Sequence, residues 1–187
     1  GQKINSYSPI EQLSLAACWN HALKLAWQVL GRKHALVCNT DIELRPDAYR
    51  LLLANSGPFV TCVSVDDAAR LDYPNPPTTS RPHPDFSCFL IRKEVTERVG
   101  WFDEAYYPAY CEDCDYHVRM HQAGIIAVCL DLPFLHHGAA TIKNANPAEQ
   151  SVIRRGADQS RRRFQAKYGC LPGTEEYGRL FAAATSQ

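Results

Sequence analysis

A short acidic stretch carries the residue types in this sequence that are best suited to chemistry. Glu112, Asp113 and Asp115 fall within four residues, at what the pattern predicts to be the start of a helix. A carboxylate can accept the proton of a hydroxyl within hydrogen-bond reach, and carboxylates also bind hard metal cations. The pair His136 and His137 follows further along the chain. Acids and histidines together predict proton transfer or metal binding.

A structural explanation for the same acids stands beside the chemical one. Acidic residues in the first turn of a helix complement the positive end of its macrodipole. Asp115 also precedes Arg119 by four residues, a spacing that stabilises a helix surface by a few tenths of a kcal/mol. Asp115 is therefore expected to pair with Arg119 rather than to act in chemistry.

A second polar group follows a predicted buried strand. The apolar run 35–38 leads directly to Asn39 and Asp41. In open α/β sheets, ligands bind at the carboxyl ends of strands, and this position favours a binding role. Asn and Asp after a strand also form ordinary turns with local hydrogen bonds, which is the structural alternative.

Alternating helices and strands are needed to position these residues, and the sequence predicts them. A capping box with proline is predicted at Ser8–Glu11, before a helix that continues to Gly31. The apolar residues expected on the buried face of that helix are Leu15, Cys18, Trp19, Ala22, Leu25, Ala26 and Val29. Further helices are predicted at 46–54, at 93–99, across the acidic stretch, and in the basic region before Gly169. Strands are predicted at 35–38, 58–65, 86–91 and 125–130, which gives an α/β layered fold.

The segment 66–85 is rich in proline, aspartate, threonine and serine. A loop of this length inside a compact domain is usually functional or mobile. No internal repeat or low-complexity tract interrupts the rest of the chain.

Composition excludes several classes of protein. The formal net charge is zero and the sequence pI is about 7.2, so no general attraction to nucleic acid is expected. No apolar run reaches the length of a membrane span, and no signal peptide opens the sequence. With eight cysteines but no secretory signal, the chain is expected to be reduced and cytoplasmic. Because the sequence does not begin with Met, an upstream piece is expected.

The motifs, taken in order, resemble the family 2 glycosyltransferases with the GT-A fold. The residues that carry the resemblance are Leu15–Asn20, Leu36–Leu44, Ser87–Arg92, Val99–Glu104, Cys111–Tyr116, Arg119, Ala123-Gly124, Pro133, His136, Phe164–Gly169 and Pro172–Glu175. They cover nearly the whole chain. The resemblance implies a GT-A-like, Rossmann-like mixed sheet flanked by helices, with a glycosyltransferase core over 1–145 and a carboxy-terminal helical extension over 146–187 packed on it.

The resemblance also assigns roles to residues. Asp41 matches the last position of a motif that holds a divalent cation, Mn²⁺ or Mg²⁺, against the donor diphosphate, and Asn39 matches its first position. His136 matches a histidine that completes the metal site, with His137 as the alternative if the register differs by one. Asn20 lies in the helix before the metal motif and is assigned to donor binding. In the acidic pair Glu112-Asp113, the Asp matches the base that deprotonates the acceptor hydroxyl in inverting members.

The implied activity is metal-dependent, inverting transfer of a sugar from a nucleotide-sugar donor to a glycan or lipid-linked acceptor. Peripheral contact with the inner face of the membrane is compatible with such an acceptor. The family begins with a strand and a helix–strand unit that grip the nucleotide base, and no match to them lies within this sequence. The chain as given is therefore expected to be amino-terminally truncated and to bind nucleotide-sugars poorly.

Two other classes of function compete with this interpretation. A GT-A-like domain could bind a glycan or nucleotide without catalysis, since fold alone does not define function. A zinc-binding structural module could use Cys111, Cys114, His117 and His121, whose types and spacings suit a metal. Four ligands on one short helix would drift around its surface, which disfavours the zinc interpretation. The arginine-rich tail could bind a phosphorylated lipid or acidic glycan, although a solvated helix face is the favoured explanation.

Overall fold

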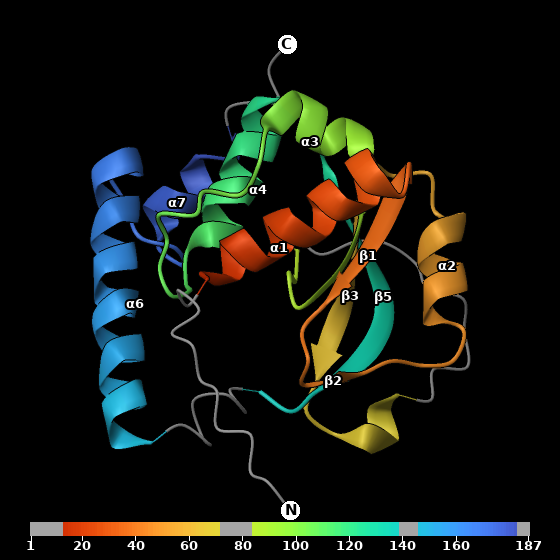
Figure 1. The fold of residues 1–187 in the computed structure, drawn as a ribbon, viewed down its shortest axis with the longest axis horizontal. Helices are drawn as coiled ribbons and strands as arrows, with labels where there is room; N and C mark the ends of the chain where they lie inside the picture. Colours follow the sequence, from red (N-terminus) through yellow and green to blue (C-terminus); the bar gives the residue numbers. More distant parts are fainter. Residues whose placement is uncertain (1–12, 72–83, 139–145, 183–187) are drawn as a thin grey trace, which may run out of the picture.

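Five strands form one mixed sheet at the centre of the fold (Figure 1). The computed structural model describes residues 13–71, 84–138 and 146–182, so the predicted capping box at Ser8 lies outside the described residues. The strands are β1 (His34–Cys38), β2 (Ile42–Glu43), β3 (Phe59–Val65), β4 (Cys88–Arg92) and β5 (Ala127–His136). Their order is β1-β4-β3-β5-β2, with β3 and β5 parallel and every other pair of neighbours antiparallel. The predicted α/β fold with a mixed sheet flanked by helices is confirmed.

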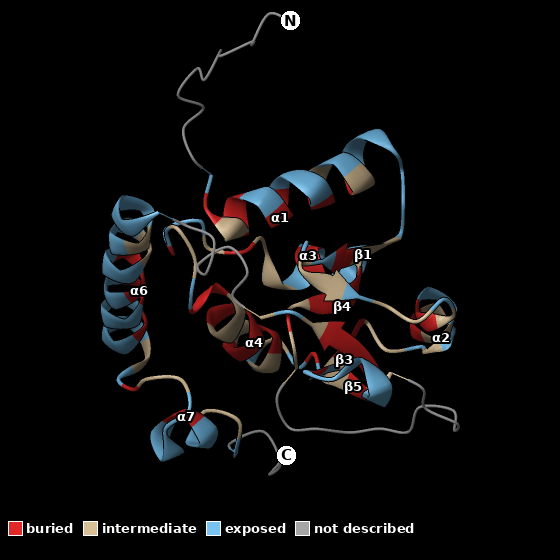
Figure 2. Cartoon of the chain, turned by 90° about the horizontal axis from the view of Figure 1, so that it is seen from below, coloured by how far each residue is buried: buried red, intermediate tan, exposed pale blue. Residues whose placement is uncertain are grey.

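Helices cover both faces of the sheet (Figures 1 and 2). Successive side chains of a strand point to opposite faces, so the apolar strands have a side to bury on each face. Phe59 and Phe89 belong to the core on the face covered by α1 (Leu15–Lys24), α3 (Lys93–Val99) and α4 (Glu112–Gln122). Val60 and Leu90, one position along each strand, belong to the core under α2 (Ala48–Ala54). Both faces of the central strands are therefore buried, as their near-continuous apolar runs require.

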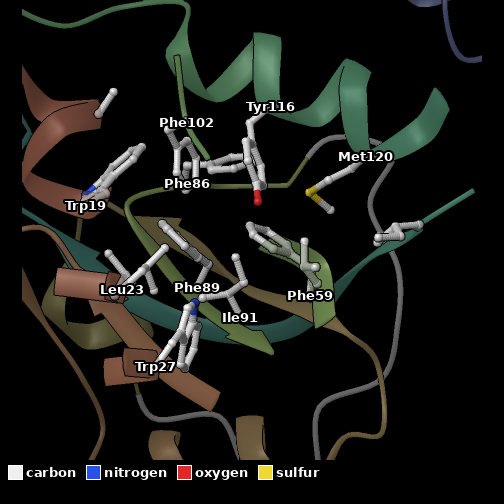
Figure 3. Packing of buried hydrophobic residues seen from close by; sticks show 14 residues of the cluster. Trp19, Leu23, Trp27, Phe59, Phe86, Phe89, Ile91, Phe102, Tyr116 and Met120 are labelled. Atoms are coloured by element: carbon white, nitrogen blue, oxygen red, sulfur yellow. The ribbon is translucent and has the colours of Figure 1, made fainter. Parts of the chain in front are cut away.

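An aromatic cluster joins α1, the sheet and α4 (Figure 3). The Phe102 and Tyr116 rings are stacked with centroids 3.9 Å apart, and those of Phe59 and Phe89 are stacked at 5.0 Å. Trp19 of α1 meets Phe102 edge-on at 5.0 Å. Such ring pairs contribute about 0.5–1.5 kcal/mol each beyond burial of area, so this cluster fixes α4 firmly on the sheet.

The first helix turns a different face to the core than the sequence predicted. The π-helix η1 (Leu25–Val29) continues α1, so one helical segment runs from Leu15 to Val29, and its cap is Ser14, whose side chain accepts the backbone N–H of Ala17, rather than the predicted Ser8. The apolar side chains that it buries are Ala16, Ala17, Trp19, Leu23 and Trp27. Cys18, Ala22, Leu25 and Val29 are exposed, and the prediction that they face the core is wrong. The apolar residues of this helix form two neighbouring stripes along its surface. The stripe that contains Trp19, Leu23 and Trp27 is the one that packs on the core.

Two carboxy-terminal helices pack beside α4. The helix α6 (Pro147–Tyr168) begins at a capping box built on Asn146, and α7 (Glu175–Arg179) follows it. A third apolar cluster joins them to α4 and the loop before it, through Tyr106, Cys111, Val118, Phe164, Cys170 and Tyr177. None of the helices in the described ranges is both long and apolar enough to cross a membrane.

Candidate functional site

The amino terminus of α4 is positioned by an uncommon backbone conformation. Tyr110 and Cys111 have φ angles of 81° and 68°, in the left-handed region that residues other than glycine rarely adopt. The chain then enters the helix at Glu112 and Asp113. Strain of this kind, about 1–3 kcal/mol per residue, persists where the surrounding structure fixes the backbone, and it is concentrated at functional sites. Cys111 itself packs in the apolar cluster with Tyr106 and Phe164.

The acidic pair lines a pocket of about 380 Å³ that also contains Asn39. Asn39 follows β1 directly, and its backbone N–H donates to the carbonyl of Ser87 at 2.8 Å. Because β1 and β4 are antiparallel, the end of one strand meets the start of the other, and Asp85 and Ser87 join the wall. The structure thus brings together Asn39, Glu112 and Asp113, three residues that the sequence assigned to one site.

A second pocket, of about 280 Å³, adjoins the first and is also lined by Asp113. The two pockets share Asp113, Pro84 and Phe86. The rest of the second wall comes from α4, through His117, and from the start of α7, through Tyr177. Asp113 therefore lies where a group bound in one pocket meets a group bound in the other.

The two carboxyls of the acidic pair differ in environment. Glu112 is 4% exposed, and its Oε2 has no hydrogen-bond partner among the residues that the structure describes. Burial, together with the negative charge of Asp113, raises the pKa of Glu112 to about 8. Burial also raises the pKa of Asp113, but its Oδ1 accepts the backbone N–H of Cys114 at 2.7 Å, which favours the charged form. Glu112, whose pKa is about 8, therefore holds a proton at neutral pH, and the pKa of Asp113 is raised as well.

Asp115 has a structural role. It is fully buried, and the predicted pair with Arg119 is present, with 2.7 Å between Nε and Oδ2. Its other oxygen accepts from Lys167 at 2.5 Å and from the Tyr168 hydroxyl at 2.9 Å, both on α6. A hydroxyl of Tyr106 at 3.3 Å completes the set. Asp115 joins α4 to α6 and has no part in either pocket.

Asp41 and His136 lie together, as the resemblance implied. One carboxylate oxygen of Asp41 is 3.4 Å from Nε2 of His136, because β2 pairs Ile42 with His136. Two donors of one cation, with bonds of about 2.1 Å, lie roughly 3 Å apart when the angle at the metal is a right angle. The carboxylate and the imidazole therefore fit two ligands of one divalent cation. Neither Asp41 nor His136 lines either pocket. Asn39, two residues before Asp41 in the sequence, lines the first pocket.

His137 is not placed as the alternative ligand. Its Nε2 lies 2.7 Å from a carboxylate oxygen of Glu43, and both side chains are about half exposed. Its backbone N–H donates to the carbonyl of Asp41 at 2.9 Å. Adjacent residues at the end of a strand direct their side chains to opposite faces, so only one of the two histidines can meet Asp41. His136 is that histidine.

The side chain of Asn20 makes structural contacts. It is fully buried, and its amide nitrogen donates to the carbonyl of Phe102 at 2.9 Å and to the Glu104 carboxylate at 2.8 Å. Its oxygen accepts the backbone N–H of Phe102 at 3.0 Å. These contacts fix α1 to the turn before α4, and Asn20 does not line either pocket, so its role in donor binding stays a prediction.

The residues proposed for a zinc module do not converge. Cys111 is buried in the cluster with Phe164, and His117 stacks on Phe181 at 4.4 Å. Within the described parts of the chain, no group of three or more His, Cys, Asp or Glu side chains could hold a metal ion. His117 and His121 lie on one face of α4, where the rings of both pack on Phe181.

Sequence reasoning missed the second pocket and the residues that the loop before β4 contributes. Phe86 lines both pockets, and Tyr177 and Gly178 of α7 line the second. Phe86 was assigned to a buried strand, and α7 comes 60 residues after the acidic pair. No local pattern marks a contact between such distant segments.

Comparison of the chain with protein-family models, with curated proteins and with solved structures found no match in any of the three. The function of the site is therefore inferred from its own geometry and from the motifs of the sequence.

Proposed function

We propose that this protein is a glycosyltransferase with a GT-A-like fold, which moves a sugar from a nucleotide-sugar donor to a hydroxyl acceptor. The observation that carries the proposal is the position of Asp113 in the wall shared by two pockets. A transferase of this type needs one site for each substrate and a carboxylate between them. The motif resemblance supports the same assignment and names the donor class.

Asp113 is the proposed base. The acceptor oxygen forms a bond to the anomeric carbon of the donor sugar while the bond from that carbon to the diphosphate oxygen breaks. The acceptor proton passes to Asp113 and then to solvent, and the nucleoside diphosphate leaves with the electron pair. Attack from the face opposite the leaving group inverts the anomeric centre. A charged Asp113 beside a protonated Glu112 is the state that this step requires.

Asp41 and His136 would hold a divalent cation, Mn²⁺ or Mg²⁺. When bound, such a cation neutralises charge on the leaving diphosphate. Asn39, two residues before Asp41, lies in the pocket with Asp113 and would contact the donor between these two groups. The donor diphosphate is therefore assigned to the β1 side of the first pocket.

The test is a transfer assay with UDP-, GDP- and dTDP-sugars at millimolar concentration, with Mn²⁺ and a panel of glycan acceptors. Asp113→Asn preserves shape but cannot accept the proton, so transfer should fall by about 10²–10⁴, the usual contribution of a general base. Donor affinity should change little. Glu176→Gln, on the exposed surface of α7, is the control and should keep full activity.

A binding domain without catalysis is the competing outcome. It would show nucleotide-sugar binding in calorimetry together with no transfer to any acceptor by the unaltered chain. Near-normal transfer by Asp113→Asn would equally overturn the proposed role of Asp113.

A further inference from the structure

Two thiols face each other across the first two strands of the sheet order. Cys38 is the last residue of β1 and Cys88 is the first residue of β4, and the two are register partners in neighbouring antiparallel strands (Figure 2). Their Sγ atoms lie 3.8 Å apart, although 50 positions separate them in the sequence. Cys38 is exposed, whereas Cys88 is buried. A sulfur that a reagent in solution can reach therefore contacts a sulfur that it cannot reach.

The backbone at this position suits a disulfide. The next two partners, Asn39 and Ser87, are joined by a hydrogen bond of 2.8 Å from the N–H of Asn39 to the carbonyl of Ser87. Hydrogen-bonded and non-hydrogen-bonded pairs alternate along antiparallel strands, so Cys38 and Cys88 form a non-hydrogen-bonded pair. The Cα atoms of such a pair lie about 4.5 Å apart, within the range of about 4.4–6.8 Å that disulfides span. Rotation of the two side chains is therefore enough to bring the sulfurs into bonding distance.

We propose that Cys38 and Cys88 form a reversible disulfide when the protein meets a disulfide of low molecular weight, such as glutathione disulfide. The Cys38 thiolate attacks one sulfur of the reagent, forms a mixed disulfide and releases one glutathione. Cys88 then loses its proton to solvent and attacks Sγ of Cys38, and the second glutathione leaves with the electron pair of the broken bond. Two protein thiols are oxidised to one disulfide, and one glutathione disulfide is reduced to two thiols.

The surroundings of the two sulfurs determine the order and the rate of these steps. Cys88 also interacts with Cys62 of β3, but Cys62 is only 2% exposed, so the reagent meets Cys38 first. The hydrogen bond with Cys88, together with burial, raises the pKa of Cys38. Because the thiolate is the form that attacks a disulfide, the exchange is slow at neutral pH, and the pair stays reduced until the reagent is in excess.

The disulfide would lie at the edge of the first pocket. Asn39 follows Cys38 and Ser87 precedes Cys88, and both Asn39 and Ser87 line that pocket. The new bond would fix the end of β1 to the start of β4, and with it this part of the pocket wall. The inference rests on the two thiols alone, so it is independent of the proposed transferase function.

The experiment maps the disulfide directly. The reduced chain is incubated with millimolar glutathione disulfide at pH 8.5, free thiols are alkylated, and the digested peptides are identified by mass spectrometry. The peptides of Cys38 and Cys88 should be joined in most molecules. Cys18, an exposed thiol on α1, should carry glutathione instead, which shows that the reagent is active. Millimolar reduced glutathione should then break the new bond, because disulfides with an exposed sulfur are the readily reduced ones.

Three serine variants provide the controls. Cys38→Ser, at an exposed position, should lose the disulfide completely, and Cys88→Ser should leave Cys38 with a bound glutathione. Cys62→Ser is the matched control and should form the disulfide as the unaltered chain does. The inference is overturned if Cys38 and Cys88 stay unlinked while Cys18 is modified, if Cys88 is joined to Cys62, or if the bond resists reduced glutathione.

Discussion

At the scale of single residues, the site depends on a difference between two adjacent carboxyls. Glu112 and Asp113 are neighbours in the first turn of α4, yet Glu112 is buried with an unpartnered oxygen, whereas Asp113 borders two pockets. Two acids this close do not both ionise readily, and the environment decides which one holds the proton. The backbone N–H of Cys114 favours the charge on Asp113. A proton on Glu112 removes one of the two negative charges of the pair, which favours ionisation of Asp113.

The protonation of Glu112 predicts how stability depends on pH. The folded-state pKa of about 8 lies above the ordinary value of 4.5, so the folded chain binds more protons between these values. The free energy of unfolding should therefore fall as pH rises from about 4.5 to about 8, by up to about 1.4 kcal/mol per pH unit. Glu112→Gln, which mimics the protonated acid, should flatten this fall.

Urea unfolding at half-unit steps from pH 5 to 8.5 measures the effect. Glu176→Gln, an exposed carboxyl on α7, is the control and should retain the slope of the unaltered chain. A slope that is identical in Glu112→Gln and the unaltered chain would contradict the protonated state assigned to Glu112. Asp113, whose pKa is also raised by burial, adds a dependence of the same sign in every variant that retains it.

The adjacent histidines give a sharp test of the metal assignment. His136 lies 3.4 Å from Asp41, whereas His137 contacts Glu43. Asp41→Ala and His136→Ala should each remove the Mn²⁺ dependence of UDP binding in calorimetric titrations, because each removes one of two protein ligands. His137→Ala should leave that dependence intact. If His137→Ala alone removes it, the register of the site is off by one residue.

At the scale of elements, α4 connects the sheet to the carboxy-terminal helices. One end of α6 is fixed by Lys167 and Tyr168, which both reach Asp115. In the middle of α6, Gly156 allows a close approach, since a Cβ there would lie 2.6 Å from the carbonyl oxygen of Tyr107. The loop before α4 is thus held between α6 and the sheet. These contacts also fix the position of the amino terminus of α4.

Loss of the Asp115 charge should weaken the contact between α4 and α6. Asp115→Asn leaves Arg119 and Lys167 without their shared carboxylate, and breaking a buried ion pair costs about 3–5 kcal/mol. We expect a value near the lower end, because Lys167 is 39% exposed. Asp158→Asn breaks an exposed pair with Arg161 on the same helix and should cost under about 1 kcal/mol. Equal losses in the two variants, measured by urea unfolding, would contradict the role of Asp115.

The elements that the sequence predicted well are those with clear boundaries. The helix at 93–99 begins after a strand and ends at Gly100, and the structure reproduces those bounds. The strand predicted at 125–130 continues to His136, because a register shift between β3 and β5 accommodates the added residues. The two-residue strand β2 has no pattern to recognise, yet it is the element that brings His136 to Asp41. The closeness of Asp41 and His136 depends on tertiary structure, so it could not be predicted from local sequence patterns.

The candidate site, like the fold, could be predicted from the sequence only in part. The acidic pair and Asn39 could be named from the sequence, because each stands where a helix begins or a strand ends. The choice of Asp113 within the pair rested on the motif resemblance. Its position between two pockets depends on Phe86 and Tyr177, which reach it from distant parts of the chain. Side-chain pattern fixes which elements form, but packing between distant elements makes the pockets.

At the scale of the whole molecule, the described parts of the carboxy-terminal region and the sheet domain form one body. The apolar cluster around Phe164 takes residues from the loop at Tyr106, from α4 and from both carboxy-terminal helices. Ser160 donates to the carbonyl of Ala109, and Arg163 pairs with Asp103. The carboxy-terminal helices therefore share an apolar cluster with α4, the helix that carries the candidate site. We expect the whole chain to unfold in one cooperative transition.

The three tryptophans of the sequence make this expectation testable. Trp19, Trp27 and Trp101 all precede residue 146, so their fluorescence reports the sheet domain alone. Phe164→Ala on α6, where the ring is fully buried, should lower the free energy of unfolding by about 3–5 kcal/mol. If the molecule is one cooperative unit, the tryptophan transition in urea shifts by that full amount. Val152→Ala, at a 42% exposed position of the same helix, should shift it by no more than about 0.5 kcal/mol. A tryptophan transition unmoved by Phe164→Ala, alongside an earlier loss of helical circular dichroism, would show that residues 146–187 unfold separately from the sheet.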